Sequence, residues 1–170
     1  MFFAFGFLER LDWWRQEVFE RFTDEARRSL FFARHKTTER NGYAISDEDV
    51  LHGIALASPA AIELLGDQAA AAFRSAESGE QYWSRIQHDR EVSIRGRKEI
   101  PLSQDAKCVL QFATEEADAF LHKEIGAEHL LLGLLRDEAT DAWRRLNEAG
   151  ARLSDVRSRV KARREGGPAT

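Results

Sequence analysis

Residues 125–135 read IGAEHLLLGLL, an apolar run with one glutamate and one histidine near its start. Residues 45–55 read ISDEDVLHGIA, with isoleucine, glutamate, leucine and glycine at the corresponding places. Apolar residues three and four positions apart predict a helix, and polar residues before them are typical of a helix N-terminus. The two stretches therefore predict one helix that occurs twice in the chain.

The self-match extends outwards without a gap, so that residues 22–55 align on residues 102–135. Identical residues at helical spacing are Ala26 and Ala106, Leu30 and Leu110, Phe32 and Phe112, Ala33 and Ala113. Thr23 and Ser103 precede them, at the place of an N-cap. A duplicated helical unit leaves this pattern. We therefore expect an all-α protein: a pseudo-twofold bundle of two four-helix repeats, with an additional N-terminal amphipathic helix.

The helix signals divide the chain into segments. Further N-caps are predicted at Ser46, Ser58 and Ser154, and a helix end at Gly150. Residues 79–101 place a few large apolar side chains among many charges without a clear period, so we expect a partly ordered connection there. The expected segments are an N-terminal amphipathic aromatic helix at 1–21, repeat one at 22–78, the connection at 79–101, repeat two at 102–164, and a frayed tail at 165–170.

Composition narrows the classes of function. The net charge of −4 gives no overall attraction to nucleic acid, and the locally basic C-terminus is expected to be a solvated, frayed end. A single cysteine, Cys108, excludes an internal disulfide framework and suits a reducing compartment. The apolar start of the chain is interrupted at Glu9, well short of the ~20 residues of a membrane span. Cytoplasmic residence without stable membrane insertion is the expectation.

Three motifs resemble the amino-terminal repeat domain of the Clp unfoldases. They are FTDEAR at 22–27, IPLSQDAK at 100–107, and above all the IGAEHLLLGLL stretch. In that family an F-T-x-x-A opening and a G-x-E-H-L-L-x-G-L segment recur twice per domain. The similarity covers about residues 22–164 and implies a Clp-type repeat domain folded as an eight-helix pseudo-twofold bundle.

The resemblance also indicates a function. No glycine in the sequence is directly followed by lysine, so a G-x-x-x-x-G-K-[ST] phosphate loop is absent from it. We therefore expect a free-standing, non-catalytic protein-binding module, acting as adaptor, substrate receptor or regulator of a Clp unfoldase–protease system. The expected partners are Clp unfoldase or protease subunits, adaptors or protein substrates, with no cofactor. The alternative is a self-assembling oligomeric protein whose ancestral docking site is unused.

Four residues could form ligand sites. Family members that bind phosphoarginine use the residues at Thr23, Glu48, Ser103 and Glu128. Free N–H groups at a helix start suit a phosphoryl group, and a carboxylate suits the guanidinium group. Acidic neighbours of Glu48 would repel a phosphate, which favours the second-repeat site. The alternative reading is that all four residues are ordinary caps and dipole partners.

Other polar groups predict no chemistry. His122 and His129, with Glu124 and Glu128, match no strong zinc spacing, so we expect solvated helix ends and no metal. Cys108 has no partner histidine that the sequence marks, and no catalytic residue is expected. We therefore expect that the chain is not an enzyme.

The aromatic N-terminal segment offers a surface that needs a cover. Its apolar stripe consists of Phe3, Phe7, Leu11, Trp14 and Val18. Packing on the protein's own bundle, formation of a homodimer and docking on another protein all remain open from the sequence.

Overall fold

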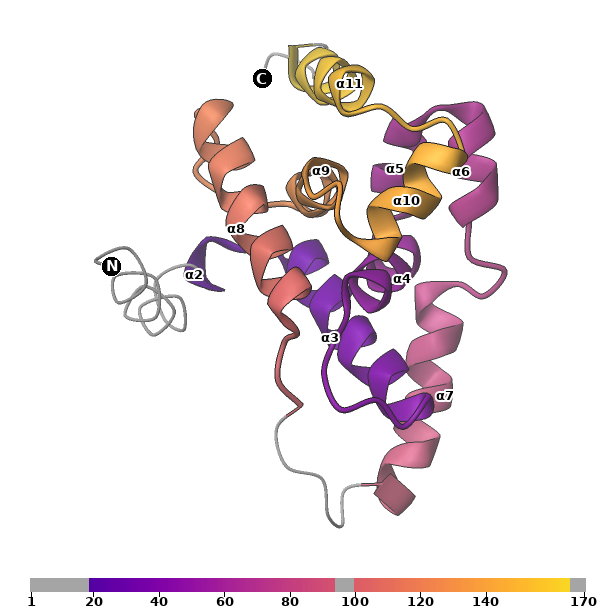
Figure 1. Ribbon diagram of the computed structural model, residues 1–170. Coiled ribbons are helices and arrows are strands. Elements are labelled where there is room, and N and C mark those ends of the chain that lie inside the picture. Colours follow the sequence, from indigo (N-terminus) through magenta and orange to yellow (C-terminus); the bar gives the residue numbers. More distant parts are fainter. Residues whose placement is uncertain (1–18, 94–99, 166–170) are drawn as a thin grey trace, which may run out of the picture.

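The computed structural model describes residues 19–93 and 100–165, and helices are the only extended regular elements within these ranges (Figure 1). The chain enters through a single helical turn, α2 (Phe19–Arg21). Most of the expected N-terminal helix, with its stripe of Phe3, Phe7, Leu11, Trp14 and Val18, lies outside the described residues. No described helix is long and apolar enough to cross a membrane.

Repeat one begins with two helices that pack on each other. These are α3 (Asp24–Glu39) and α4 (Asp47–Ala57). Asn41 takes a left-handed φ of 56° just after α3, and Ser46 starts α4 with a capping box in which Asp49 bonds back to the Ser46 backbone. A short α5 (Pro59–Ile62), the 3-10 turn η2 (Glu63–Leu65) and α6 (Asp67–Phe73) complete the repeat.

Repeat two follows the same plan. It consists of α8 (Gln104–Ala119), α9 (Ala127–Arg136), α10 (Asp141–Glu148) and α11 (Leu153–Glu165). Leu121, at the place that corresponds to Asn41, has a φ of 57°, and Gly150 ends α10 with a φ of 91°. The two repeats therefore share the backbone geometry of the turn after their first helix, as well as their sequence pattern.

Helix α9 lies at the centre of the bundle (Figure 1). It contacts α8, α10 and α11 of its own repeat and α3, α4 and α5 of the other. All of its residues are buried except Glu128 and Arg136, which are half-buried. A helix that is apolar on nearly every side is stable only when other helices surround it. One core therefore joins both repeats.

The two repeats are tied where their helices start. The Thr23 N–H donates to the Ile125 carbonyl at 3.0 Å, and the Ser103 N–H donates to the Ile45 carbonyl at 2.9 Å. These bonds belong to two isolated parallel bridges, Phe22 with Ile125 and Ile45 with Leu102. Each bridge joins the start of one repeat's first helix to the start of the other repeat's second helix.

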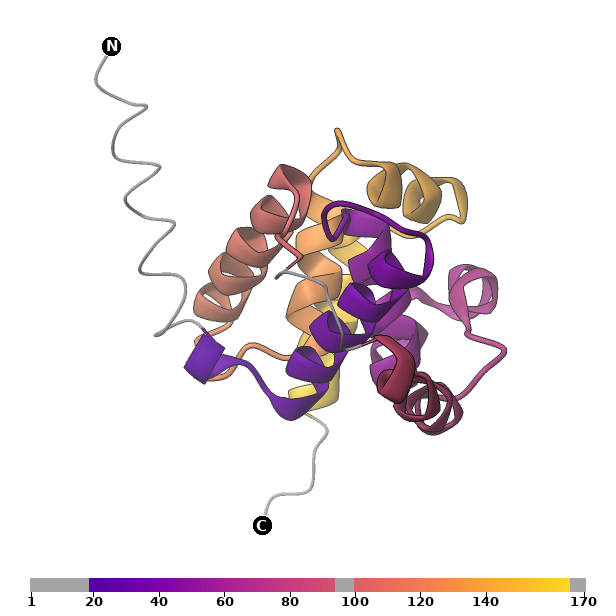
Figure 2. The same cartoon turned by 90° about the horizontal axis from the view of Figure 1, so that it is seen from below.

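The stretch after residue 79 differs from the prediction. Gly79–Ser93 forms a fifteen-residue helix, α7, beside α3 and α4 (Figures 1 and 2). Tyr82 and Ile86 of α7 are buried against Phe32 and Leu56 in a second, smaller core cluster. The expectation of a partly ordered connection is wrong for this part, because tertiary burial rather than sequence period holds the helix.

Two smaller expectations are also wrong, and a third holds only in part. Ser58 is the N-cap residue of α5 with Pro59 after it, but its hydroxyl makes no cap bond and donates to Glu25 at 2.9 Å. Ser154 lies inside α11 instead of before it. The basic C-terminal run is helical through Glu165 and bonded: Arg157 binds Glu116 across two hydrogen bonds, and Arg159 donates to the Leu64 carbonyl. These arginines bind groups in both repeats, so the run is no frayed end.

Candidate functional site

Both predicted N-caps are present. The hydroxyl oxygen of Thr23 accepts from the Ala26 N–H at 3.2 Å, and that of Ser103 accepts from the Ala106 N–H at 3.1 Å. Thr23 and Ser103 are half-buried, so their hydroxyls border solvent at the ends of α3 and α8. The first backbone N–H groups of a helix have no acceptor within its hydrogen-bond ladder, so they can donate to a ligand.

The glutamates stand opposite the caps of the other repeat. Ile125 bonds to the backbone beside Thr23, which brings the start of α9, with Glu128, next to the start of α3. In the same way Ser103 is paired with the segment that leads to Glu48. The sequence groups Ser103 with Glu128 because they share a repeat, whereas the fold groups Thr23 with Glu128 and Ser103 with Glu48.

The Thr23 end carries a small cavity. Glu128 and Glu25 line it together with Ser58, just before α5, and Arg163 of α11, around a volume of about 280 Å³. The Glu128 carboxylate folds back over Gly126, where a side chain would collide with it. Two carboxylates and one guanidinium at the rim give a pocket that suits a ligand with both a cationic and an anionic group.

The Ser103 end is more acidic. Burial, with the nearby charges of Asp47, Asp137 and Asp141, raises the pKa of Asp105, two residues into α8. Glu48 is already paired with Arg145 at 3.0 Å and lines a separate cavity of about 400 Å³ with Phe73. A phosphate would meet a negative field at this helix start.

The two acidic neighbours of Glu48, Asp47 and Asp49, are buried and accept hydrogen bonds that stabilise the fold. Asp49 is buried, and its carboxylate accepts from both Nε and Nη2 of Arg40, at 3.0 and 2.6 Å. Asp47 is buried too, and accepts from the backbone N–H of Ala142 in α10 at 2.7 Å. The expected repulsion by Asp49 is therefore offset by Arg40, and the acidity at this end comes from Asp47, Asp105, Asp137 and Asp141 instead.

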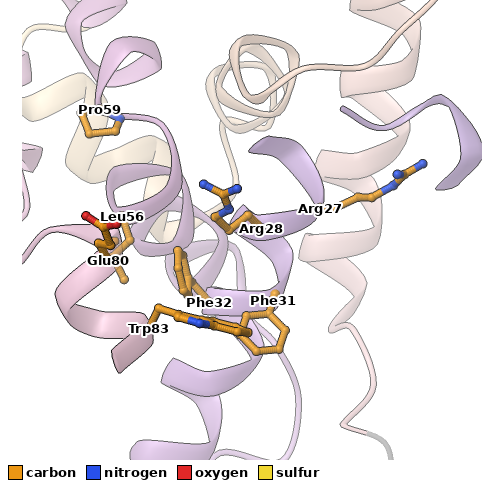
Figure 3. Close-up of a pocket in the computed structure, with 9 residues that line it drawn as sticks. Arg27, Arg28, Phe31, Phe32, Leu56, Pro59, Glu80 and Trp83 are labelled. Carbon is orange, nitrogen blue, oxygen red and sulfur yellow. The ribbon is translucent and has the colours of Figure 1, made fainter. Parts of the chain in front are cut away.

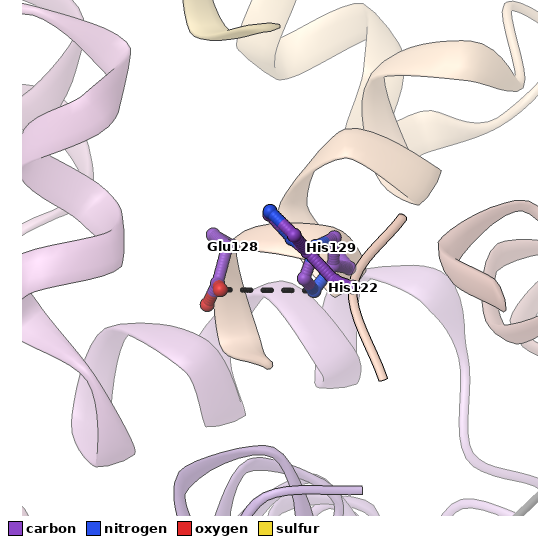
Figure 4. Close-up of side chains that lie close together, drawn as sticks. All are labelled: His122, Glu128 and His129. Atoms are coloured by element: carbon purple, nitrogen blue, oxygen red, sulfur yellow. Dashed lines mark hydrogen bonds and ion pairs between the residues drawn. The ribbon is translucent and has the colours of Figure 1, made fainter. Parts of the chain in front are cut away.

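Two histidines and Glu128 gather at the start of α9 (Figure 4). The Gly126 N–H donates to Nδ1 of His129 at 2.9 Å, and Nε2 of His129 lies 2.8 Å from Nδ1 of His122. Because Nδ1 accepts, the neutral His129 ring carries its proton on Nε2 and donates to His122. One His129 nitrogen thus takes part in the cap of α9, and the other bonds to His122. The expected solvated helix end is wrong for His129, which is fully buried.

A larger cavity of about 870 Å³ lies between α3, α7 and the end of α4 (Figure 3). Its apolar lining comes from Phe31, Phe32, Leu56, Pro59 and Trp83, and its charged lining from Arg27, Arg28 and Glu80. This cavity is not predicted from the sequence, because it depends on α7, whose packing position no local pattern specifies.

Cys108 shows no sign of a nucleophile. Burial raises the pKa of its thiol, and its sulfur lies 3.8 Å from the amide nitrogen of Gln104. A reactive cysteine needs the opposite shift, since the thiolate is the nucleophile.

The fold and these cavities define a class: an all-α tandem-repeat domain with cavities beside the helix starts where its repeats meet. The family model of the Clp repeat (R) N-terminal domain matches residues 21–149 and, in a second match, residues 101–168. The chain belongs to this family.

Relatives and solved structures agree with that assignment. The chain is 31% identical over 150 residues to chaperone protein ClpC2, chloroplastic, of Oryza sativa subsp. japonica, and 32% identical over 148 residues to chaperone protein ClpC1, chloroplastic, of Arabidopsis thaliana. These alignments cover 85% and 84% of this chain but 15% of each relative, so the chain spans about one seventh of their length.

Two solved structures share the fold. The N-terminal domain of ClpD from Arabidopsis thaliana has a TM-score of 0.58 at 19% identity, covering 89% of this chain and 99% of that one. The Hsp104 N-terminal domain from Candida albicans also has a TM-score of 0.58, at 20% identity, covering 86% of this chain and 93% of that one.

Proposed function

We propose that this chain is a non-catalytic protein-binding module of the Clp unfoldase–protease type, which receives adaptors or protein substrates. Membership of the Clp repeat (R) N-terminal domain family carries the proposal. The chain's own groups support it: the described residues offer pockets at helix starts, and Cys108 is not activated. Clp unfoldase or protease subunits, adaptors and substrates are the proposed partners.

Isolation of the proteins that bind this chain tests its proposed role as a protein-binding module. The full chain, tagged and expressed at its natural level, is isolated from its own cells after mild cross-linking. Clp subunits, or clients that accumulate when the protease is inactivated, should be enriched over a control with an unrelated helical domain. Recovery of neither class would contradict the proposal.

A finer proposal concerns the ligand. Phosphoarginine would place its phosphoryl group at the free N–H groups of the α3 start and its guanidinium near Glu128. The Thr23 end is favoured over the Ser103 end because Arg163 lines its pocket, whereas Asp105 raises the negative charge at the other. Glu48, held by Arg145, would first have to leave that partner.

Titration with free phosphoarginine tests the ligand. Amide signals of residues 24–26 and 126–128 should shift at millimolar ligand, and Glu128→Gln should weaken binding roughly tenfold, the factor for loss of about 1.4 kcal/mol. Glu48→Gln is the matched control and should leave these shifts unchanged. Shifts with arginine alone or with inorganic phosphate alone should be far smaller. The absence of any shift would remove phosphoarginine and leave protein docking untouched.

A further inference from the structure

The large cavity between α3 and α7 has an incomplete lining. Phe31 and Trp83 are half-buried, with ring centroids 5.1 Å apart, and Phe31 also contacts His35 at 4.5 Å between centroids. In Figure 3 the two rings lie side by side below the Arg28 guanidinium. Arg28 makes no hydrogen bond or ion pair with any residue in the described ranges. Aromatic surface and an unpaired cation therefore border the same hollow.

Repeat two has fewer aromatic side chains on the corresponding face. Gln111 stands where repeat one has Phe31, and Arg136 stands where it has Leu56. The Arg136 guanidinium lies 4.4 Å from the centre of the half-buried Phe112 ring, so in repeat two a cation contacts the phenylalanine that corresponds to Phe32. Helix α7 covers Phe32, which is 1% exposed, but leaves Phe31 and Trp83 partly uncovered. Repeat one therefore retains an apolar face that a further element could cover.

The described chain begins beside Arg27, one of the residues that line this cavity. Arg27 lines the cavity, and its Nη2 donates to the carbonyl oxygens of Phe19 at 3.1 Å and Glu20 at 3.3 Å. The preceding eighteen residues contain Phe7, Leu11 and Trp14 at helical spacing. A helix over residues 3–18 would be about 24 Å long, enough to reach across a cavity at whose rim it is anchored.

We propose that residues 3–18 of this chain dock in cis into the cavity between α3 and α7, with their apolar stripe against Phe31 and Trp83. The tether decides between occupants, since a segment held at the rim is present at an effective concentration of the order of millimolar. The segment carries Glu9, Asp12 and Glu17 for Arg28, and Arg10 and Arg15 for Glu80. This surface uses residues other than the helix-start sites, so it stands apart from the proposed function.

A paramagnetic label tests the docking on the full chain. In a Cys108→Ser background, Glu80→Cys is labelled with a nitroxide, and the indole N–H signals of all tryptophans are recorded by NMR. Trp13 and Trp14 should be broadened along with Trp83, whereas Trp143 should not. A label at Glu115→Cys, on the exposed side of α8, is the control and should leave Trp13 and Trp14 sharp. Sharp signals for both with the Glu80 label would overturn the proposal.

Variants of the cavity lining and a mixing experiment test whether the broadening depends on this cavity and arises within one molecule. Phe31→Lys should abolish the broadening and raise amide exchange in residues 3–18 at least about tenfold, which corresponds to about 1.4 kcal/mol of docking free energy. Gln111→Lys, at the corresponding place of repeat two, should change neither. In a second sample, protein at natural isotope abundance that carries the nitroxide is mixed with isotope-labelled protein that carries no nitroxide. Broadening of Trp13 and Trp14 in that mixture would mean that a second copy fills the cavity, which overturns docking in cis.

Discussion

Leu121 occupies a backbone conformation that its side chain does not favour. Its φ is 57°, and its side chain is 90% exposed, so no packing compensates for the left-handed geometry. Left-handed geometry costs about 1–2 kcal/mol for a residue with a Cβ atom, whereas glycine adopts it freely. The corresponding residue of repeat one, Asn41, is a residue type that tolerates this region.

Leu121→Gly should therefore stabilise the protein. We expect a gain of about 0.5–1 kcal/mol, because relief of the left-handed conformation exceeds the larger unfolded-state entropy of glycine. Asn41→Gly is the matched control and should give a smaller gain. Urea unfolding of the two variants measures the difference, and a loss of stability in Leu121→Gly would show that the exposed leucine contributes a contact.

The third residue of the two capping boxes differs between the repeats. Asp49 bonds the Ser46 backbone in one, and His129 bonds the Gly126 backbone in the other. Burial tends to raise the pKa of the Asp49 carboxyl, but hydrogen bonds from Arg40, Ser46 and Thr37 outweigh it and hold that pKa below its ordinary value. A carboxylate is thus kept charged at one cap and a neutral ring at the other.

The Asp49 shift predicts a pH dependence of stability. A pKa lowered by folding contributes stability above the unfolded value of about 3.9, and this contribution is lost as the pH falls through the folded value. The difference in unfolding free energy between the wild type and Asp49→Asn should be full near neutral pH and shrink below about pH 4. Denaturant titrations at several pH values measure it. A difference that stays constant into acid would contradict the assignment.

At the scale of helices, Gly53 and Gly133 set how closely each helix pair packs. A methyl group on Gly53 would collide with the Ser29 carbonyl of α3, and one on Gly133 would collide with the Val109 carbonyl of α8. These glycines correspond in the two repeats. Each lies where a second helix crosses the backbone of the first, so the motif's glycine is a packing requirement.

Gly53→Ala and Gly133→Ala should both destabilise the fold. Helix propensity alone would favour alanine by about 1 kcal/mol, but overpacking against backbone costs about 1–3 kcal/mol and reverses the sign. Ala71→Gly, on the exposed side of α6, measures the propensity contribution separately. Thermal unfolding of the three variants checks the signs, and stabilisation by either alanine would mean that the helices can move apart.

Helix α7 shows where local pattern fails at this scale. Its large apolar residues, which include Tyr82, Trp83 and Ile86, are scattered among charged ones, so its sequence carries only a weak helical signal. Its place is decided by Phe32 and Leu56, which it buries. In contrast, the sequence predicts α9 as a helix, because its apolar residues recur three and four positions apart, although its central place is decided by tertiary packing.

At the scale of the whole molecule, a few polar contacts fix how the repeats sit together. Asp47 of α4 accepts from the Ala142 N–H at the start of α10, and both residues are buried. Repeat two has Ala127 at the place of Asp47, so this contact occurs once. The two halves are therefore related by a pseudo-twofold axis, and the paired bridges at the helix starts obey it, whereas the Asp47 contact does not.

Asp47→Ala should lower the free energy of unfolding by removing a hydrogen bond between the two repeats. It leaves the Ala142 N–H without an acceptor in a dry environment, at a cost of about 1–3 kcal/mol. Asp47→Asn retains a carbonyl oxygen and should recover most of the loss. Unfolding free energies, together with amide exchange at Ala142, measure the effect. Equal stability of Asp47→Ala and wild type would show that another group accepts this bond.

The sequence by itself determined the duplication, the all-α class, the caps Thr23, Ser46 and Ser103, and the family. Each of these depends on short-range spacing, which a linear pattern records directly. Tertiary structure alone decided that Thr23 stands with Glu128 and Ser103 with Glu48, that α7 opens a cavity beside Phe31, and that the C-terminal arginines bind both repeats. Those facts depend on contacts between residues far apart in the chain, which repeat spacing does not encode.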